Sequence, residues 1–143
     1  MKASARNQFN GIVSDIVAGA VNAEVHVTLP GGDLIAATIT QESVATLALA
    51  KGMAVTALIK APHIILVTDF GGYKLSARNQ LPGTVAAIKP GQVNAEVVIE
   101  LAGGEHVAAT VTQDSIEHLG LRKGQKVMAV FKAGAVILAV AAA

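Results

Sequence analysis

The segment Ser4-Ala5-Arg6-Asn7-Gln8, near the start of the chain, recurs 72 positions later as Ser76-Ala77-Arg78-Asn79-Gln80. A second segment, Val21-Asn22-Ala23-Glu24-Val25, recurs at the same separation as Val93-Asn94-Ala95-Glu96-Val97. Two blocks that repeat at one spacing indicate that a longer unit was duplicated. Both copies are therefore expected to adopt one fold.

The duplication covers nearly the whole chain. Residues 4–70 align with residues 76–142 without a gap, and 33 of these 67 positions are identical. The joint between the copies lies near Gly71 and Gly72, where two glycines interrupt the pattern. The sequence therefore predicts two tandem modules, at residues 1–71 and 72–143.

Within each copy, short runs rich in β-branched residues alternate with turn signals. In the first copy, the predicted strands cover residues 4–16, 21–29, 34–40, 54–60 and 64–68. The helical interval 41–49 falls between the third and fourth strands, and Pro30-Gly31-Gly32 predicts a hairpin turn. This is the element order of an OB-like barrel. We expect an all-β protein of two tandem OB-like five-stranded β-barrel modules, each with one short helix.

The composition is that of an ordered chain, because 52% of the 143 residues are hydrophobic and 15% are charged. Modules of about 70 residues bury only about 60% of their unfolded surface, so we expect them to assemble into an oligomer. No apolar run reaches the roughly 18 residues of a membrane span, and the first residues do not resemble a signal peptide. We expect a cytoplasmic protein with no membrane partner. A net charge of +1 does not favour nucleic acid as a partner.

Both copies carry the same hydrogen-bond donors. Arginine, lysine, serine, threonine and asparagine side chains recur at matching positions, with one identical acid, Glu24 and its repeat Glu96. Such groups suit a small oxyanion better than a metal cation, and Arg6 and Lys60 can offset the charge of a dianion. The chain lacks cysteine, and none of its four histidines recurs in the other copy. We therefore expect neither catalysis nor a directly ligated metal.

Several of these residues also have structural interpretations. Arg6 can pair with Glu24 on the surface, and Thr40 can cap the short helix that follows it. Lys51 fits a solvated charge near the helix end, and Asn22 fits a turn or a left-handed position. The sequence leaves these alternatives open.

With its two copies of the patterns at residues 4–11 and 16–25, the chain resembles the Mop modules of molybdate-binding proteins and looks like a di-Mop molbindin. The resemblance implies an OB-like fold, binding of molybdate or tungstate between modules without a cofactor, and assembly into a homotrimer. The anion ligands it implies are Ser4, Ala5, Arg6, Thr40, Lys60 and Ala61, with Ser76, Ala77, Arg78, Thr112, Lys132 and Ala133. A second class of molybdate site, near the three-fold axis, would be lined by Val21, Asn22, Ala23, Val93, Asn94 and Ala95.

Two other functions compete with anion binding. An oligonucleotide-binding barrel would need stacking aromatic side chains and a basic groove, whereas aromatic residues make up only 3% of this chain. A structural or regulatory oligomerisation module would need a further domain to act on, and the two repeats account for the sequence. We therefore expect a role in intracellular molybdenum storage or homeostasis.

Overall fold

The computed structural model describes residues 1–142, and each repeat contributes five strands. In the first repeat these are β1 (Asn7–Ala18), β2 (Asn22–Thr28), β3 (Leu34–Thr40), β4 (Ala54–Ile59) and β5 (Ile65–Val67). In the second they are β6 (Asn79–Lys89), β7 (Asn94–Leu101), β8 (His106–Thr112), β9 (Lys126–Phe131) and β10 (Ile137–Ala139). The short helices are α1 (Gln41–Thr46) and α2 (Gln113–Leu119), and single 3-10 turns form η1 (Ala61–His63) and η2 (Ala133–Ala135). The expected all-β fold with tandem modules is confirmed.

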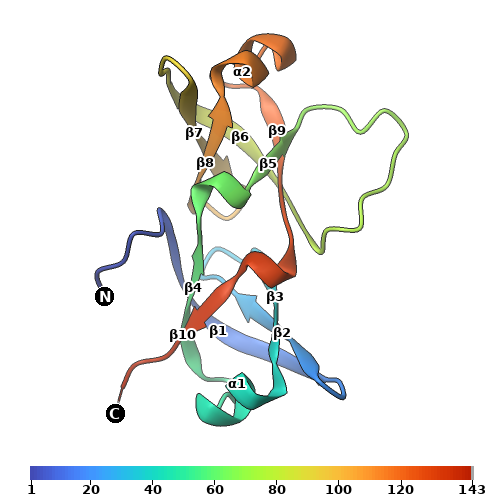
Figure 1. Cartoon of the computed structure of the whole chain (residues 1–143), viewed down its shortest axis with the longest axis vertical. Coiled ribbons are helices and arrows are strands. Elements are labelled where there is room, and N and C mark those ends of the chain that lie inside the picture. Colours follow the sequence, from blue (N-terminus) through green and yellow to red (C-terminus); the bar gives the residue numbers. More distant parts are fainter. Residues whose placement is uncertain (143) are drawn as a thin grey trace.

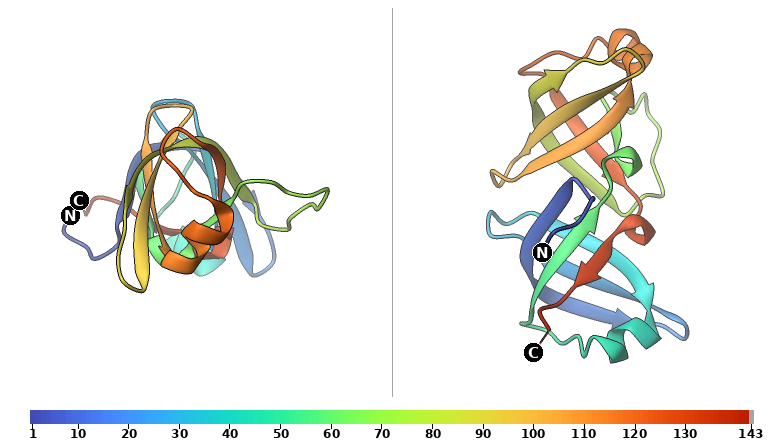
Figure 2. Two further views of the ribbon diagram at one scale, coloured as in Figure 1. Left: turned by 90° about the horizontal axis from the view of Figure 1, so that it is seen from above. Right: turned by 60° about the vertical axis from the view of Figure 1, so that its left-hand side comes forward.

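The strands form two antiparallel sheets that lie one above the other along the long axis of the molecule (Figure 1). One sheet has the order β10-β4-β1-β2-β3, and the other has the order β5-β9-β6-β7-β8. The last strand of each repeat therefore pairs in the sheet of the other repeat. Figure 2 shows this exchange from a second side, with the red β10 beside the green β4.

The connection after β4 leads the chain into the other sheet. Lys60 is extended, and η1 closes with a hydrogen bond of 3.0 Å from the N–H of His63 to the carbonyl of Lys60. Short 3-10 turns of this kind are frequent connectors between elements. The chain then passes to the other sheet, where β5 pairs with β9.

The exchanged segments fill the core of the opposite repeat. Ile64 and Leu66 are buried, as are Val136 and Leu138 of the second repeat. The buried apolar side chains of both repeats form a single cluster. Each sheet thus depends on the other repeat for part of its core, so the predicted boundary near residues 71–72 separates two units of sequence rather than two independent sheets.

Several element ends differ from the sequence prediction, most of all in β1 and α1. β1 begins at Asn7 rather than residue 4 and continues to Ala18 through an irregularity between Val13 and Asp15. α1 ends at Thr46, short of the predicted residue 49, because Ala48 adopts a left-handed backbone with φ of 51°. Neither difference changes the order of the elements.

The two hairpin turns, β2–β3 and β7–β8, contact each other at the junction of the repeats. The N–H of Gly31 donates to Glu105 Oε1 at 3.0 Å, and the N–H of Gly103 donates to Asp33 Oδ2 at 2.9 Å. A Cβ on Gly31 would lie 2.1 Å from the carbonyl oxygen of Gly103. Glycine is therefore required at Gly31 by the close approach of two backbones.

We expect Gly31→Ala to lower the free energy of unfolding by about 1–3 kcal/mol, because neither backbone can yield without breaking the paired turns. Urea denaturation measures this loss. Gly134→Ala is the matched control, since a Cβ there meets no atom within 4 Å. Equal stability of the two variants would show that the turns do not touch in solution.

Candidate oxyanion-binding site

Two asparagines of the repeated segment lie at the junction of the sheets. Asn7 and Asn79, the first residues of β1 and β6, are buried, with 2% and 1% of their surface exposed. The Asn79 amide donates to the carbonyl of Ala36 and accepts from its N–H, both at 2.8 Å. Asn7 binds Ala108 in the same way, at 2.9 and 2.7 Å. Because Ala36 and Ala108 lie in the edge strands β3 and β8, each amide takes the place of a neighbouring strand.

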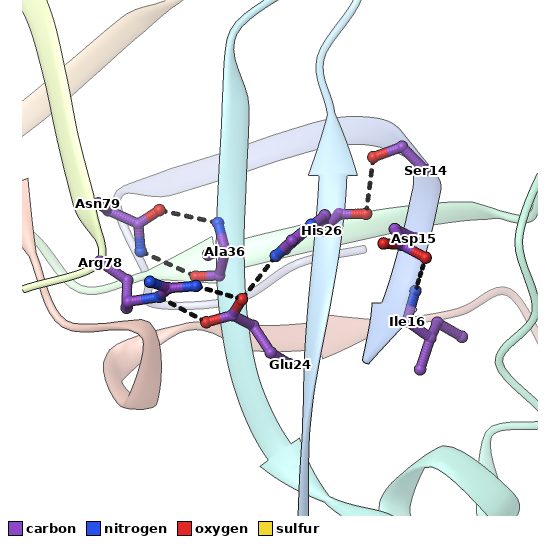
Figure 3. A network of polar contacts seen from close by, with 8 residues as sticks. All are labelled: Ser14, Asp15, Ile16, Glu24, His26, Ala36, Arg78 and Asn79. Atoms are coloured by element: carbon purple, nitrogen blue, oxygen red, sulfur yellow. Dashed lines mark hydrogen bonds and ion pairs between the residues drawn. The ribbon is translucent and has the colours of Figure 1, made fainter. Parts of the chain in front are cut away.

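The side chain that precedes Asn79 reaches the other repeat. Arg78 donates from Nε and Nη2 to the two carboxylate oxygens of Glu24 in β2, each at 2.7 Å (Figure 3). His26 Nε2 lies 2.7 Å from Oε2 of the same carboxylate. The hydrogen bond from Arg78, followed by that from His26, lowers the pKa of Glu24 from 4.5 to about 2, and the ion pair raises the pKa of Arg78. Both partners are therefore charged at neutral pH.

This ion pair predicts acid sensitivity. A carboxyl group whose pKa is lower in the folded protein than in the unfolded chain stabilises the fold above its unfolded pKa. The contribution of Glu24 is therefore complete above about pH 4.5 and is lost as the pH falls toward 2. We expect the urea midpoint to fall across this window, and to fall less steeply in Glu24→Gln. Parallel curves for the two proteins would contradict the pairing.

The equivalent pair joins Arg6 to Glu96 in β7, so the two ion pairs cross the repeat boundary in opposite directions. The alternative in which Arg6 pairs with Glu24 is therefore wrong. Arg6 lies against the other repeat, and Glu24 is engaged by Arg78 instead. Val98 stands where the first repeat has His26, so the two networks are not identical.

Three of the predicted anion ligands line one cavity. Ser4, Ala5 and Lys60 surround a hollow of about 410 Å³, and the second repeat forms part of its wall through Gly134 and Ala135 of η2. The hollow therefore lies between the repeats rather than within one of them.

The guanidinium of Arg6, two residues after Ser4, is turned toward Glu96 of the second repeat.

The predicted ligands of the serine and lysine segments have the same exposure in both copies. Ala61 and Ala133, the first residues of η1 and η2, are both buried. Lys60 and Lys132, which precede them, are exposed. Ser76 is likewise exposed, and Ala77 is half-buried, as are Ser4 and Ala5 respectively.

The two threonines have a structural role. Thr40 Oγ1 accepts from the N–H of Ser43 at 3.0 Å and donates to the Ser43 hydroxyl at 2.9 Å, which confirms the helix-cap interpretation. Thr112 caps α2 in the same way. Thr40 lines a separate hollow beside Val136 of the second repeat, so the structure does not bring Thr40 together with Lys60.

The segments assigned to the second class of site are partly exposed. Val21 and Val93 are 72% and 73% exposed, and the asparagines that follow them are exposed too. Ala23 and Ala95 are buried in the core. Asn22 is the first residue of β2. The interpretation of Asn22 as a turn or left-handed residue is therefore wrong.

Within residues 1–142, no group of three or more histidine, aspartate or glutamate side chains is placed to hold a metal ion. In the same part of the chain, no helix is long and apolar enough to cross a membrane. At the junction, the guanidinium groups of Arg6 and Arg78 are exposed, and exposed guanidinium donors suit the binding of an anion.

Comparison with known proteins extends this picture. The family model of the TOBE domain matches residues 3–66 and again residues 75–138. The molybdenum transport protein ModE of Herbaspirillum seropedicae is 48% identical over 140 residues, which are 98% of this chain and 52% of that protein. The molybdenum-pterin-binding protein MopA of Rhodobacter capsulatus is 40% identical over 139 residues, 97% of this chain and 52% of that protein. The chain spans about half the length of these curated relatives.

A solved structure matches over the full length. The cytoplasmic molybdate-binding protein ModG, in a form with molybdate bound, is 52% identical and superposes with a TM-score of 0.95. The match covers 99% of this chain and 100% of that one. The arrangement of two sheets described above is therefore also that of a protein solved with an oxyanion.

Proposed function

Because the chain belongs to the family of proteins with TOBE domains, we propose that it binds molybdate reversibly in the cytoplasm, and tungstate in the same sites. The observation that carries the proposal is the likeness, over the whole chain, to a protein solved with molybdate bound. The donors at the junction of the repeats support it independently. The relatives are named for binding or transport of molybdenum, and we propose no chemistry on the ligand.

The chemistry of the junction suits a tetrahedral dianion. Such an ion leaves water only where positive charge and N–H or O–H donors replace its hydration. We propose that Arg6 and Lys60 supply charge at one site, and that Ser4 and the main chain at Ala5 and Ala61 supply donors. The second site then comprises Ser76, Ala77, Arg78, Lys132 and Ala133.

Each threonine is proposed to act in the site of the other repeat. Thr40 lies beside Val136, and it pairs across the β2–β3 ladder with Asn22, two residues before the Glu24 that holds Arg78. Its hydroxyl would join the Arg78 site by releasing the hydroxyl of Ser43. Thr112 is the equivalent residue for the other site.

Selectivity follows from size and protonation. Sulfate has the same charge and shape as molybdate, so the cavity must distinguish them by the dimensions of the anion. Phosphate carries a proton near neutral pH, and a site made of donors leaves that proton without an acceptor. We therefore propose that molybdate and tungstate are bound and that sulfate and phosphate are rejected.

We propose that the chain functions as a homotrimer. Large apolar side chains are exposed at equivalent places in both repeats, namely Val21 with Val93 and Ile65 with Ile137. Matching apolar positions on a small protein suit burial against further copies of the chain. The three-fold axis would bring the Val21 and Val93 segments of several chains together, which is where the second class of molybdate site is proposed.

Calorimetric titration of the full chain with molybdate, tungstate, sulfate and phosphate tests the proposal, with the mass of the assembly measured in parallel. We expect dissociation constants in the micromolar range or tighter for the first two anions, which corresponds to at least about 8 kcal/mol of binding free energy. We expect no measurable heat for sulfate or phosphate. Sulfate binding as tight as molybdate binding would overturn the proposed selectivity.

We propose storage or homeostasis of molybdenum as the cellular role. A second candidate is the ligand-binding part of a longer protein, because the alignment to ModE covers only 52% of that relative. Overproduction of the chain in cells grown on limiting molybdate distinguishes the two. Storage predicts that cells retain more molybdenum after washing, whereas unchanged retention would favour the second candidate.

A further inference from the structure

We propose that Glu24 and Glu96 are positioning residues for oxyanion binding, each of which orients the anion-binding arginine of the opposite repeat. This inference rests on the proposed function, since it concerns how the same sites are built. The carboxylates are not ligands, because a carboxylate repels a dianion. Their role is to hold the arginine in the orientation that the anion needs.

The hydrogen-bond geometry leaves the arginine able to bind an anion. A guanidinium has five N–H donors in a planar fork. Arg78 gives Glu24 one from Nε and one from Nη2, both at 2.7 Å. The other three, two on Nη1 and one on Nη2, remain along the opposite edges of the fork. The carboxylate thus fixes the plane of the guanidinium without exhausting its donors.

The two charges lie at different depths. Only 20% of the Glu24 side chain is exposed, whereas 62% of the Arg78 side chain is exposed. The second pair has the same layering, with 24% for Glu96 and 56% for Arg6. An anion that arrives from solvent therefore meets the guanidinium first, with the carboxylate behind it.

Both ends of the Arg78–Glu24 pair are anchored. Glu24 lies in the central part of the β2 ladder and is contacted by His26 as well as by Arg78 (Figure 3). The backbone next to Arg78 is held by the two hydrogen bonds between Asn79 and Ala36. Because a free arginine side chain samples many rotamers, an arginine held in advance loses less entropy when the anion binds.

The test compares molybdate affinity in full-length variants that keep a single arginine site. In an Arg6→Ala background, the Arg78 site remains, and we expect Glu24→Gln to weaken molybdate binding there by about tenfold, the lower range for groups that orient a ligand residue. By charge alone, removal of a carboxylate would strengthen anion binding. Weaker binding is therefore the outcome that only a positioning role predicts. Glu24→Asp, which keeps the charge but shortens the reach, should weaken binding as well.

Glu100→Gln is the matched control, because Glu100 is an exposed strand glutamate whose partner, His106, lies in its own repeat. We expect its molybdate affinity to equal that of the parent. A measurement without anion adds a second readout: the Nε–Hε signal of Arg78 in ¹⁵N NMR should be sharp and slow to exchange in the parent, and lost or broadened in Glu24→Gln.

The outcomes separate the inference from the proposed function. If the unmodified chain does not bind molybdate, the proposed function fails and the inference fails with it. If the unmodified chain binds molybdate and Glu24→Gln binds it equally or more tightly, the function stands and only the positioning role is overturned. An Arg78 signal that is the same in both proteins would also overturn it.

Discussion

The double substitution Arg6→Ala with Arg78→Ala is expected to weaken molybdate binding at both sites by about a hundredfold. A hydrogen bond to a charged group contributes about 1.5–3 kcal/mol, and each 1.4 kcal/mol is about a factor of ten in affinity. The loss has a second source, because Glu24 and Glu96 would keep their charge beside the site after their partners are removed. Titration calorimetry of the variant at one fixed salt concentration measures the change.

Arg122→Ala is the control for this substitution. Arg122 is an exposed arginine in the turn after α2, outside the residues proposed to bind the anion. The double variant removes two positive charges and the control removes one, so Lys123→Ala is added to the control to match the net charge. We expect the control to bind molybdate as the parent does. An equal loss in both proteins would mean that the arginines act through overall charge and not as ligands.

Local features of the fold were predictable from the sequence. The cap of α1 was one of the interpretations that the sequence offered for Thr40, because a helix cap depends on residues only three positions apart, and Thr112 caps α2 at the equivalent position. The order of strands and helix followed in the same way from turn signals within one repeat. Interactions of this kind depend on neighbouring positions, which a single sequence displays directly.

The exchange of the last strands was not predictable. Leu66 pairs with Ala129 in the other repeat, and Leu138 pairs with Ala57. Because Ala57 and Ala129 are equivalent positions of the two copies, pairing within a repeat would bury the same kind of surface. The duplicated sequence therefore does not distinguish the two arrangements, and the exchange is seen only in the strand pairing of the structure.

The site was predictable in its residue types but not in its grouping. The sequence identified Arg6 and Glu24 as recurring charged residues, and the ion pair it offered as an alternative joined them within one repeat. In the structure, Arg6 pairs with Glu96 and Arg78 pairs with Glu24, so each arginine is paired with the glutamate of the opposite repeat. Because both copies carry the same glutamate, the sequence alone does not show whether Glu24 or Glu96 is the partner of a given arginine.

The buried asparagines were recognised as recurring polar residues, but their role came only from the structure, and it predicts a large effect on stability. Asn79→Ala would leave the N–H and carbonyl of Ala36 without partners in a buried strand edge. A buried group left unpaired costs about 1–3 kcal/mol, so we expect the free energy of unfolding to fall by about 2–4 kcal/mol in urea denaturation. Asn10→Ala is the control, because Asn10 is exposed and proline occupies its place in the second repeat, and we expect a change within about 0.5 kcal/mol. A loss no greater than that of the control would show that water reaches Ala36 and that the two repeats are not held together by this amide.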